Sequence, residues 1–92
     1  MEFEWDPKKA TLNLRKHRVS FEEASSVFGD AFAVVYEDPD HSAREKRYLM
    51  IGTSANGRLL HIAFADRGGR IRIISARKPT RSEKKFYEEE VR

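Results

Sequence analysis

The spacing of hydrophobic positions changes along the chain between a helical and a strand period, and this change predicts the order of its elements. Residues 2–5 alternate polar and aromatic side chains, as a short strand does. Asp6-Pro7 then predicts the N-cap and first turn of a helix that ends near His17. A second helix is expected after Ser20, with a capping box that Glu23 completes by reaching back to the Ser20 amide.

Apolar and β-branched residues dominate four later segments, which are predicted to be strands over residues 32–36, 44–54, 58–66 and 70–77. Asn56-Gly57 predicts a type I′ hairpin turn in which both residues take positive φ, and Gly68-Gly69 predicts a second tight turn. Thr80 and Glu83 form another capping box, which predicts a final helix. The core is expected to include the aromatic residues Phe3, Trp5, Phe28, Phe32 and Phe64.

These elements predict a single α+β domain over residues 1–92, with the order β-α-α-β-β-β-β-α. Strands joined by short hairpins form an antiparallel meander, which the two N-terminal helices and the one C-terminal helix are available to cover. A chain of 92 residues is also shorter than the length of roughly 150 residues above which chains divide into domains.

The composition argues against several classes of protein. The chain has no cysteine, so neither disulfides nor thiolate metal sites are available to it. No segment approaches the roughly 18 consecutive apolar residues of a membrane span, and the N-terminus lacks the basic and apolar regions of a signal peptide. We therefore expect a cytoplasmic protein without a membrane partner.

Charge is distributed unevenly between the two halves of the chain. The net charge is +3, with eight Lys and Arg against ten Asp and Glu in residues 1–57, and ten against five in residues 58–92. Such asymmetry predicts a basic face that meets phosphates or an acidic protein partner. The alternative is a solvated surface on a small, charge-rich domain.

Several segments, in order along nearly the whole chain, resemble those of a known family. They are residues 3–7, 16–17, 19–24, 28–30, 40–42, 51–52, 57–60 and 72–77, together with Glu45, Arg47, Glu83 and Tyr87. In these segments the chain is similar to the BrnT-type toxins of type II toxin–antitoxin systems, which have a RelE-like fold.

The resemblance implies a function and a set of partners. It implies an endoribonuclease that inhibits translation, uses neither metal nor cofactor, and cleaves RNA by attack of the ribose 2′-hydroxyl on the adjacent phosphorus. It also implies a BrnA-like ribbon-helix-helix antitoxin, with operator DNA bound only through the antitoxin complex. Such cleavage requires a base for the 2′-hydroxyl, stabilisation of the phosphorane-like oxygens and an acid for the 5′-oxygen.

The first candidate catalytic group is formed by His41, Glu45 and Arg47. Glu45 and Arg47 are two residues apart on the predicted strand and share one face, whereas Arg44 points to the other. A carboxylate beside an arginine stays ionised, which suits a base or an orienting group, and the imidazole of His41 suits an acid or a base. The alternatives are a surface salt bridge for Glu45–Arg47 and a turn-stabilising hydrogen bond for His41.

The second candidate group is formed by Arg72, Ser75 and Arg77. On a regular strand, Arg72 lies on the opposite face from Ser75 and Arg77. Either a bulge near Ile74 re-aims the end of the strand, or the two arginines have different functions. We favour the second option, in which Arg72 and Arg77 do not both contact RNA. Arg77 suits bidentate binding of a phosphate, and the alternative is a structural ion pair with Glu83.

Three further residues are candidates for contacting RNA, each with a structural alternative. Arg58 follows a hairpin turn, and its alternative role is that of a polar residue flanking the turn. Lys16 is near the end of the first helix, where the alternative is a favourable interaction of its charge with the helix dipole. Tyr87 suits stacking on a base or packing on the sheet. No metal site is expected, because the histidines lie on separate elements and Asp38, Asp40 and His41 offer few oxygens.

Readings of another functional class remain open. The same basic sheet suits a non-catalytic protein- or nucleic-acid-binding module, or an inactive toxin retained as a co-repressor. The basic second half is expected to bind an acidic or amphipathic antitoxin segment that covers the catalytic face. Because the sheet has exposed edges, we also expect that the protein can form a homodimer within the toxin–antitoxin complex.

Overall fold

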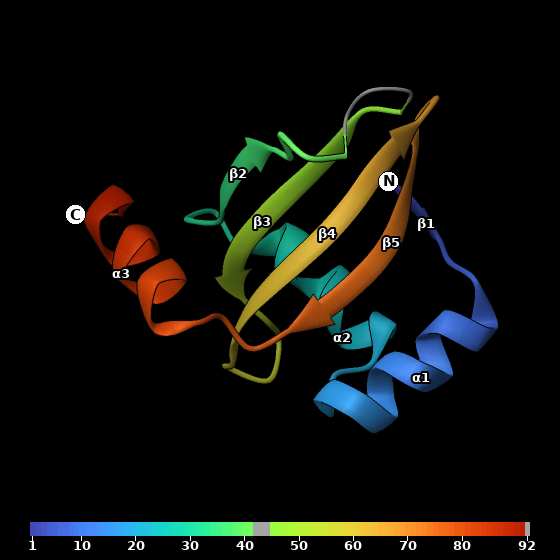
Figure 1. Ribbon diagram of the computed structural model, residues 1–92, viewed down its shortest axis with the longest axis horizontal. Helices are drawn as coiled ribbons and strands as arrows, with labels where there is room; N and C mark the ends of the chain where they lie inside the picture. The colour runs from blue at the N-terminus through green and yellow to red at the C-terminus, as the bar shows by residue number, and fades with distance from the viewer. Residues whose placement is uncertain (42–44, 92) are drawn as a thin grey trace.

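The computed structural model describes residues 1–41 and 45–91, which form three α-helices and one five-stranded sheet (Figure 1). In chain order the elements are β1 (Glu2–Glu4), α1 (Pro7–His17), α2 (Phe21–Ser26), the 3₁₀ turn η1 (Val27–Gly29), β2 (Val34–Glu37), β3 (Arg47–Thr53), β4 (Leu59–Arg67), β5 (Arg70–Arg77) and α3 (Arg81–Glu90). The predicted α+β class and element order are confirmed. The predicted start of the third strand at Arg44 lies outside the described residues.

The strands lie in the order β1-β5-β4-β3-β2. Strands β2 to β5 form the predicted antiparallel meander, and β1 adds a parallel edge strand beside β5, which makes the sheet mixed. Helix α2 lies behind the sheet in Figure 1, α1 lies at the lower right and packs against β5, and α3 stands beside β3. We call the sheet face opposite α1 and α2 the open face.

The core fills the space between the sheet and the first two helices. Its fully buried side chains include Phe21, Ile62 and Ile73. Around them, four aromatic rings are linked by contacts of Phe3 with Phe28, Phe28 with Phe64, and Phe64 with Tyr48. These contacts confirm the prediction for Phe3, Phe28 and Phe64, and Trp5 packs against Phe21.

The core prediction is wrong for Phe32, whose side chain is 69% exposed. The Phe32 amide donates to Asp30 Oδ1 at 2.9 Å, which holds the residue in a turn after η1. Strand β2 therefore begins at Val34, two residues later than predicted.

A β-bulge in β5 sets which side chains reach the open face. Ala63 pairs with Ser75 and the next β4 residue, Phe64, pairs with Ile73, so Ile74 is the extra residue of β5. Because β4 continues without a break, the partners of its open-face residues also point to the open face. Arg72, Ser75 and Arg77 therefore share that face, and our preferred prediction that Arg72 and Arg77 lie on opposite faces is wrong.

The hairpin turns follow different geometries. Gly68 and Gly69 both have positive φ, as the predicted tight turn between β4 and β5 requires. In the turn between β3 and β4, only Gly57 has positive φ and the Gly57 amide donates to the Ser54 carbonyl. The predicted type I′ turn is therefore wrong: Ala55 and Asn56 turn without positive φ, and Gly57 alone takes the left-handed conformation.

A buried asparagine joins α1 to the sheet. Asn13 Nδ2 donates to the carbonyls of Val19 and Ala76 at 2.9 and 2.7 Å, and Asn13 Oδ1 accepts from the Ala76 amide at 3.1 Å. These bonds satisfy backbone groups at the end of β5 and before α2. Leu12, the neighbouring apolar residue, is instead 61% exposed.

Gly52 is required by the close approach of β3 to η1. A Cβ at this position would lie 2.8 Å from Val27 Cγ1 and 2.9 Å from Ala33 Cβ. We expect Gly52→Ala to lower the free energy of unfolding by about 1–3 kcal/mol, because the buried contact leaves no space for the methyl group. Urea denaturation measures this effect. The control is Gly29→Ala, whose Cβ meets nothing within 4 Å, and an equal loss there would contradict the explanation.

Candidate functional site

The open face carries a cluster of carboxylates and arginines at the end nearest the Gly68-Gly69 turn. Glu45 Oε1 accepts from Arg67 Nε at 2.6 Å, and Glu45 Oε2 lies 3.4 Å from Arg47 Nε. From the edge strand, Glu4 Oε2 accepts from Arg72 Nη1 at 3.0 Å. We call this group the turn-end cluster; its members are Glu2, Glu4, Glu45, Arg47, Arg67, Arg70 and Arg72.

Within this cluster Glu45 is an ionised carboxylate. The hydrogen bond from Arg67 lowers the pKa of Glu45, and the hydrogen bond from Arg47 acts in the same direction. A lowered pKa also makes the carboxylate a weaker proton acceptor. The predicted Glu45–Arg47 pair is thus present, and its geometry suits orienting the arginines better than removing a proton.

His41 lies beside this cluster, after β2. Its Nδ1 is 3.1 Å from Asp38 Oδ2, and the Asp38 amide donates to the carbonyl of Arg47, the first residue of β3. Asp38 is nearly buried, whereas the His41 side chain is 61% exposed. The imidazole is thereby held by Asp38, whose backbone is bonded to the start of β3, and most of its surface is open to solvent.

A second cluster lies at the other end of the open face, where α3 begins. Arg77 forms a bidentate ion pair with Glu83, with Nη1–Oε1 and Nη2–Oε2 distances of 2.8 and 3.0 Å. His61 Nε2 lies 3.3 Å from both Glu83 Oε2 and the Tyr36 hydroxyl. The ring of Tyr36 packs edge-on against Phe86. We call these residues the α3-end cluster.

The electrostatics of the α3-end cluster follow from burial and from the Arg77–Glu83 pair. The Arg77 hydrogen bond is the main cause that lowers the pKa of Glu83 to about 2. Burial lowers the pKa of His61, which is 5% exposed, and raises the pKa of Tyr36. His61 is therefore neutral at pH 7 and too enclosed to reach a substrate.

The lowered pKa of Glu83 predicts a loss of stability in acid. Its stabilising contribution is present above the unfolded value of 4.5 and disappears as the pH falls towards the folded value of about 2. We expect Glu83→Gln to lower the free energy of unfolding by on the order of 2–3 kcal/mol at pH 7 and by little at pH 2. Urea denaturation at pH 7, 4 and 2 measures the difference, and a penalty independent of pH would contradict it.

The two clusters lie apart on the same face. Arg47 pairs with Ala65, which pairs with Arg72, whereas Arg77 pairs with His61. Ala65 and His61 are four residues apart, so at about 3.3 Å per residue Arg77 lies roughly 13 Å along the strands from the turn-end cluster. Ser75, opposite Ala63, occupies the space between them.

Two of the remaining predicted residues lie away from the open face. Arg58 Nε donates to Glu23 Oε2 at 2.9 Å, and Arg58 Nη2 also contacts Glu23 Oε1 and the Arg18 carbonyl. Glu23 thus engages Arg58 and Ser54 instead of the Ser20 amide that the capping-box prediction assigns to it. Lys16 lines a groove on the α1 side of β5.

Tyr87 lies on α3, partly buried. The capping box of this helix forms as predicted, since Thr80 and Glu83 exchange both of its hydrogen bonds. Glu83 therefore caps α3 and binds Arg77 with the same carboxylate, so the start of α3 and the Arg77 guanidinium hold each other in place.

Sequence reasoning did not identify several members of these clusters, among them Arg67, Glu4 and His61. Arg67 shares the Arg47 face through the β3–β4 register, so strand alternation across the hairpin is a signal that was available. Glu4 reaches the cluster only because β1 pairs in parallel with β5, a pairing that no local pattern indicates. His61 depends on the packing of α3 and carries no motif.

Within residues 1–41 and 45–91, no three His, Cys, Asp or Glu side chains are grouped so as to hold a metal ion. Among the described helices, none has the length and apolar character needed to cross a membrane.

Comparison with known proteins decides the family. The family model described as "Ribonuclease toxin, BrnT, of type II toxin-antitoxin system" matches residues 5–83 of this chain. The chain belongs to the BrnT family. Its membership makes it a toxin of a type II toxin–antitoxin system with ribonuclease activity, and it implies an antitoxin partner and RNA targets.

A solved structure from the BrnT family has the same fold. The crystal structure of the Brucella abortus ribonuclease toxin BrnT, at 1.1 Å resolution, superposes with a TM-score of 0.69. The two chains are 21% identical, over 88% of this chain and 99% of the Brucella chain. No curated protein sequence matches this BrnT-family chain. At 21% identity the Brucella toxin shows the fold of this chain. The roles of individual residues are argued from the contacts in this chain.

Proposed function

We propose that this BrnT-family toxin is a metal-independent endoribonuclease that cleaves RNA on the open face of its sheet, by attack of the ribose 2′-hydroxyl on the adjacent phosphorus. The observation that carries the proposal is the bulge at Ile74, which brings Arg72, Ser75 and Arg77 onto the same face as Arg47. An RNA strand that crosses this face meets a cation at both ends of its path.

Arg47 and Arg72 are the proposed stabilisers of the charge that develops on the phosphorane-like oxygens. They flank Ala65 from the two neighbouring strands, which places their Cα atoms about 10 Å apart at roughly 4.8 Å per strand. Their side chains are 34% and 30% exposed. Arg72 gives one of its five N–H donors to Glu4 and keeps others for a phosphate. Fixed donors aimed at developing charge are typically the largest single source of rate enhancement.

His41 is the proposed acid or base, because its exposed imidazole is held by Asp38, whose amide is bonded to the Arg47 carbonyl. Glu45 is proposed to orient Arg47 and Arg67, since both arginines donate to its carboxylate. In this scheme the 2′-hydroxyl loses its proton to His41, or the 5′-oxygen gains a proton from it, while Arg47 holds the phosphate.

Arg77, Ser75 and Tyr87 are the proposed contacts for nucleotides next to the cleaved bond. The Glu83 carboxylate fixes the plane of the Arg77 guanidinium, and the Arg77 side chain remains 34% exposed. A guanidinium held in this way is prepared to bind a phosphate without a further loss of side-chain freedom. Ser75, which is partly buried, lies between this subsite and the turn-end cluster.

The partners are proposed from the family. A BrnA-like ribbon-helix-helix antitoxin neutralises the toxin in the cytoplasm, and operator DNA is bound only through their complex. Cleavage of messenger RNA is the proposed route to inhibition of translation. A homodimer of the toxin within that complex remains part of the proposal.

The test is incubation of the purified toxin with naked RNA in EDTA, with and without ribosomes. We expect cleavage in EDTA and fragments that end in a 2′,3′-cyclic phosphate and a 5′-hydroxyl, because the 2′-oxygen is the nucleophile. If RNA stays intact in every condition while the toxin still binds its antitoxin, the protein is a non-catalytic binding module and the proposed function is wrong. Cleavage that requires added Mg²⁺ would contradict the metal-independent mechanism.

A further inference from the structure

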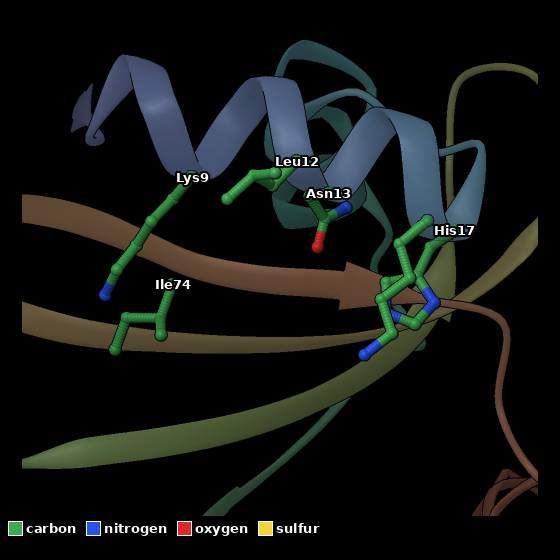
Figure 2. A pocket seen from close by; sticks show the side chains of 6 residues that line it. Lys9, Leu12, Asn13, His17 and Ile74 are labelled. Atoms are coloured by element: carbon green, nitrogen blue, oxygen red, sulfur yellow. The ribbon is translucent and has the colours of Figure 1, made fainter.

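A shallow groove of about 180 Å³ runs between α1 and β5, on the side of the sheet away from the open face. Figure 2 shows Lys9 extending from α1 towards Ile74 of β5, with Leu12 and Asn13 farther along the helix and His17 near its end. The lining consists of Lys9, Leu12, Asn13, Lys16, His17 and Ile74. Its floor is apolar and its rim is basic.

In residues 1–41 and 45–91, no carboxylate is paired with the cations around this groove. Helix α1 contains Lys8, Lys9, Arg15 and Lys16 and no Asp or Glu. Within the described part of the chain, none of these four side chains forms an ion pair. The arginines of β5, by contrast, are all paired with Glu2, Glu4 or Glu83. Among the described residues, the cations of α1 therefore lack the counter-charges that the arginines of β5 have.

The groove residues of α1 are spaced to match another helix. Lys9 and Lys16 are two helical turns apart, or about 10 Å at 1.5 Å per residue, and Leu12 lies between them. This three-plus-four spacing is the one with which helices present a seam to each other. A facing helix with carboxylates seven residues apart and an apolar side chain between them would satisfy both lysines and cover Leu12 and Ile74.

We propose that this groove is the docking site for an acidic amphipathic helix of the partner antitoxin. The proposal rests on membership of the BrnT family, which implies an antitoxin, and it does not depend on how RNA is cleaved. The exposed Leu12 favours a protein over a nucleic acid, because a phosphate backbone would contact the lysines and leave the leucine in water. All the cations of this groove lie on α1, in the acidic first half of the sequence, so the antitoxin docks on a different surface from the one that charge asymmetry predicts.

Docking at this groove places the antitoxin directly behind the bulge. Ile74 is the extra residue of β5, and it is also the β5 residue that lines the groove. Two β5 arginines of the open face, Arg72 and Arg77, stand on either side of it. A helix packed on Ile74 therefore contacts the element that brings these arginines onto one face.

The test measures binding of the antitoxin from the same operon to toxin variants, without RNA, by isothermal titration calorimetry. Lys9→Glu and Leu12→Ala are the groove variants. Lys85→Glu, at an exposed lysine of α3, and Leu14→Ala, at the second exposed leucine of α1, are their matched controls. We expect Kd to rise at least tenfold for each groove variant and less than twofold for each control.

RNA cleavage by the same variants separates this proposal from the proposed function. We expect Lys9→Glu and Leu12→Ala to cleave RNA within twofold of the unsubstituted toxin, and circular dichroism checks their fold. Unchanged antitoxin affinity in both groove variants would overturn the proposal. A loss of cleavage with unchanged antitoxin affinity would make the groove an RNA surface, as the sequence prediction for Lys16 implies, and would overturn it as well.

Discussion

Replacing Arg47 with alanine is expected to lower kcat/KM for RNA cleavage by about 10²–10³, the usual effect of removing one donor aimed at the charge of a transition state. The loss should fall mainly on kcat, because the charge develops only as the phosphorane forms. The free energy of unfolding should change little, because Glu45 retains its 2.6 Å hydrogen bond to Arg67. The partly exposed Arg47–Glu45 ion pair itself contributes little to stability. Single-turnover cleavage of a labelled RNA measures the change.

The matched control for Arg47→Ala is Arg15→Ala, at an exposed arginine of α1. It removes the same charge from the chain and leaves the open face intact, so its cleavage rate should stay within about threefold of the unsubstituted toxin. Equal losses in the two variants would show that general charge, and not the position of Arg47, drives RNA binding. That result would remove Arg47 from the catalytic group.

Asn13→Ala is expected to destabilise the fold by about 2–4 kcal/mol. The substitution leaves the Val19 carbonyl and both polar backbone groups of Ala76 without their side-chain partner in a buried place. Each buried polar group left without a partner costs roughly 1–3 kcal/mol, partly relieved when water enters. For a domain of this size, such a loss lowers Tm by on the order of 10–20 °C.

Thermal and urea unfolding measure the Asn13 effect, with Thr11→Ala as its control. Thr11 is exposed on the same helix, and its hydroxyl donates only to the Pro7 carbonyl one turn earlier. The control should change stability by less than about 1 kcal/mol. A similarly small change for Asn13→Ala would show that the α1–β5 connection does not depend on its side chain.

Much of the fold is predictable because its signals are local. Asp6 accepts from the Lys8 amide at 2.8 Å, as its sequence position predicts for an N-cap. The type I′ prediction at Asn56-Gly57 is wrong because Gly57 alone supplies the left-handed residue of that hairpin. The parallel pairing of β1 with β5 joins segments that are far apart in sequence, so no local pattern specifies it.

The sequence predicts the ion pairs of the site, but it does not predict where these pairs lie relative to one another. The spacing of Glu45 and Arg47 and the candidate ion pair between Arg77 and Glu83 are both visible in the sequence, and both contacts are present. The face of Arg72 is not predictable from alternation, because the bulge depends on how β5 packs against β4 and α1. The net charge of residues 1–57 does not indicate that α1 is basic, because Asp and Glu residues between positions 22 and 45 offset the charge of its lysines.

The central claim is that RNA binds and is cleaved on the open face. The most direct measurement is a ¹⁵N NMR titration of the toxin with an RNA oligonucleotide that carries 2′-deoxy sugars, which remove the attacking nucleophile and leave the phosphates. We predict shifts concentrated at Arg47, Arg72, Ser75 and Arg77, with little change along α1. Shifts confined to α1 and the groove beside Ile74 would contradict the claim.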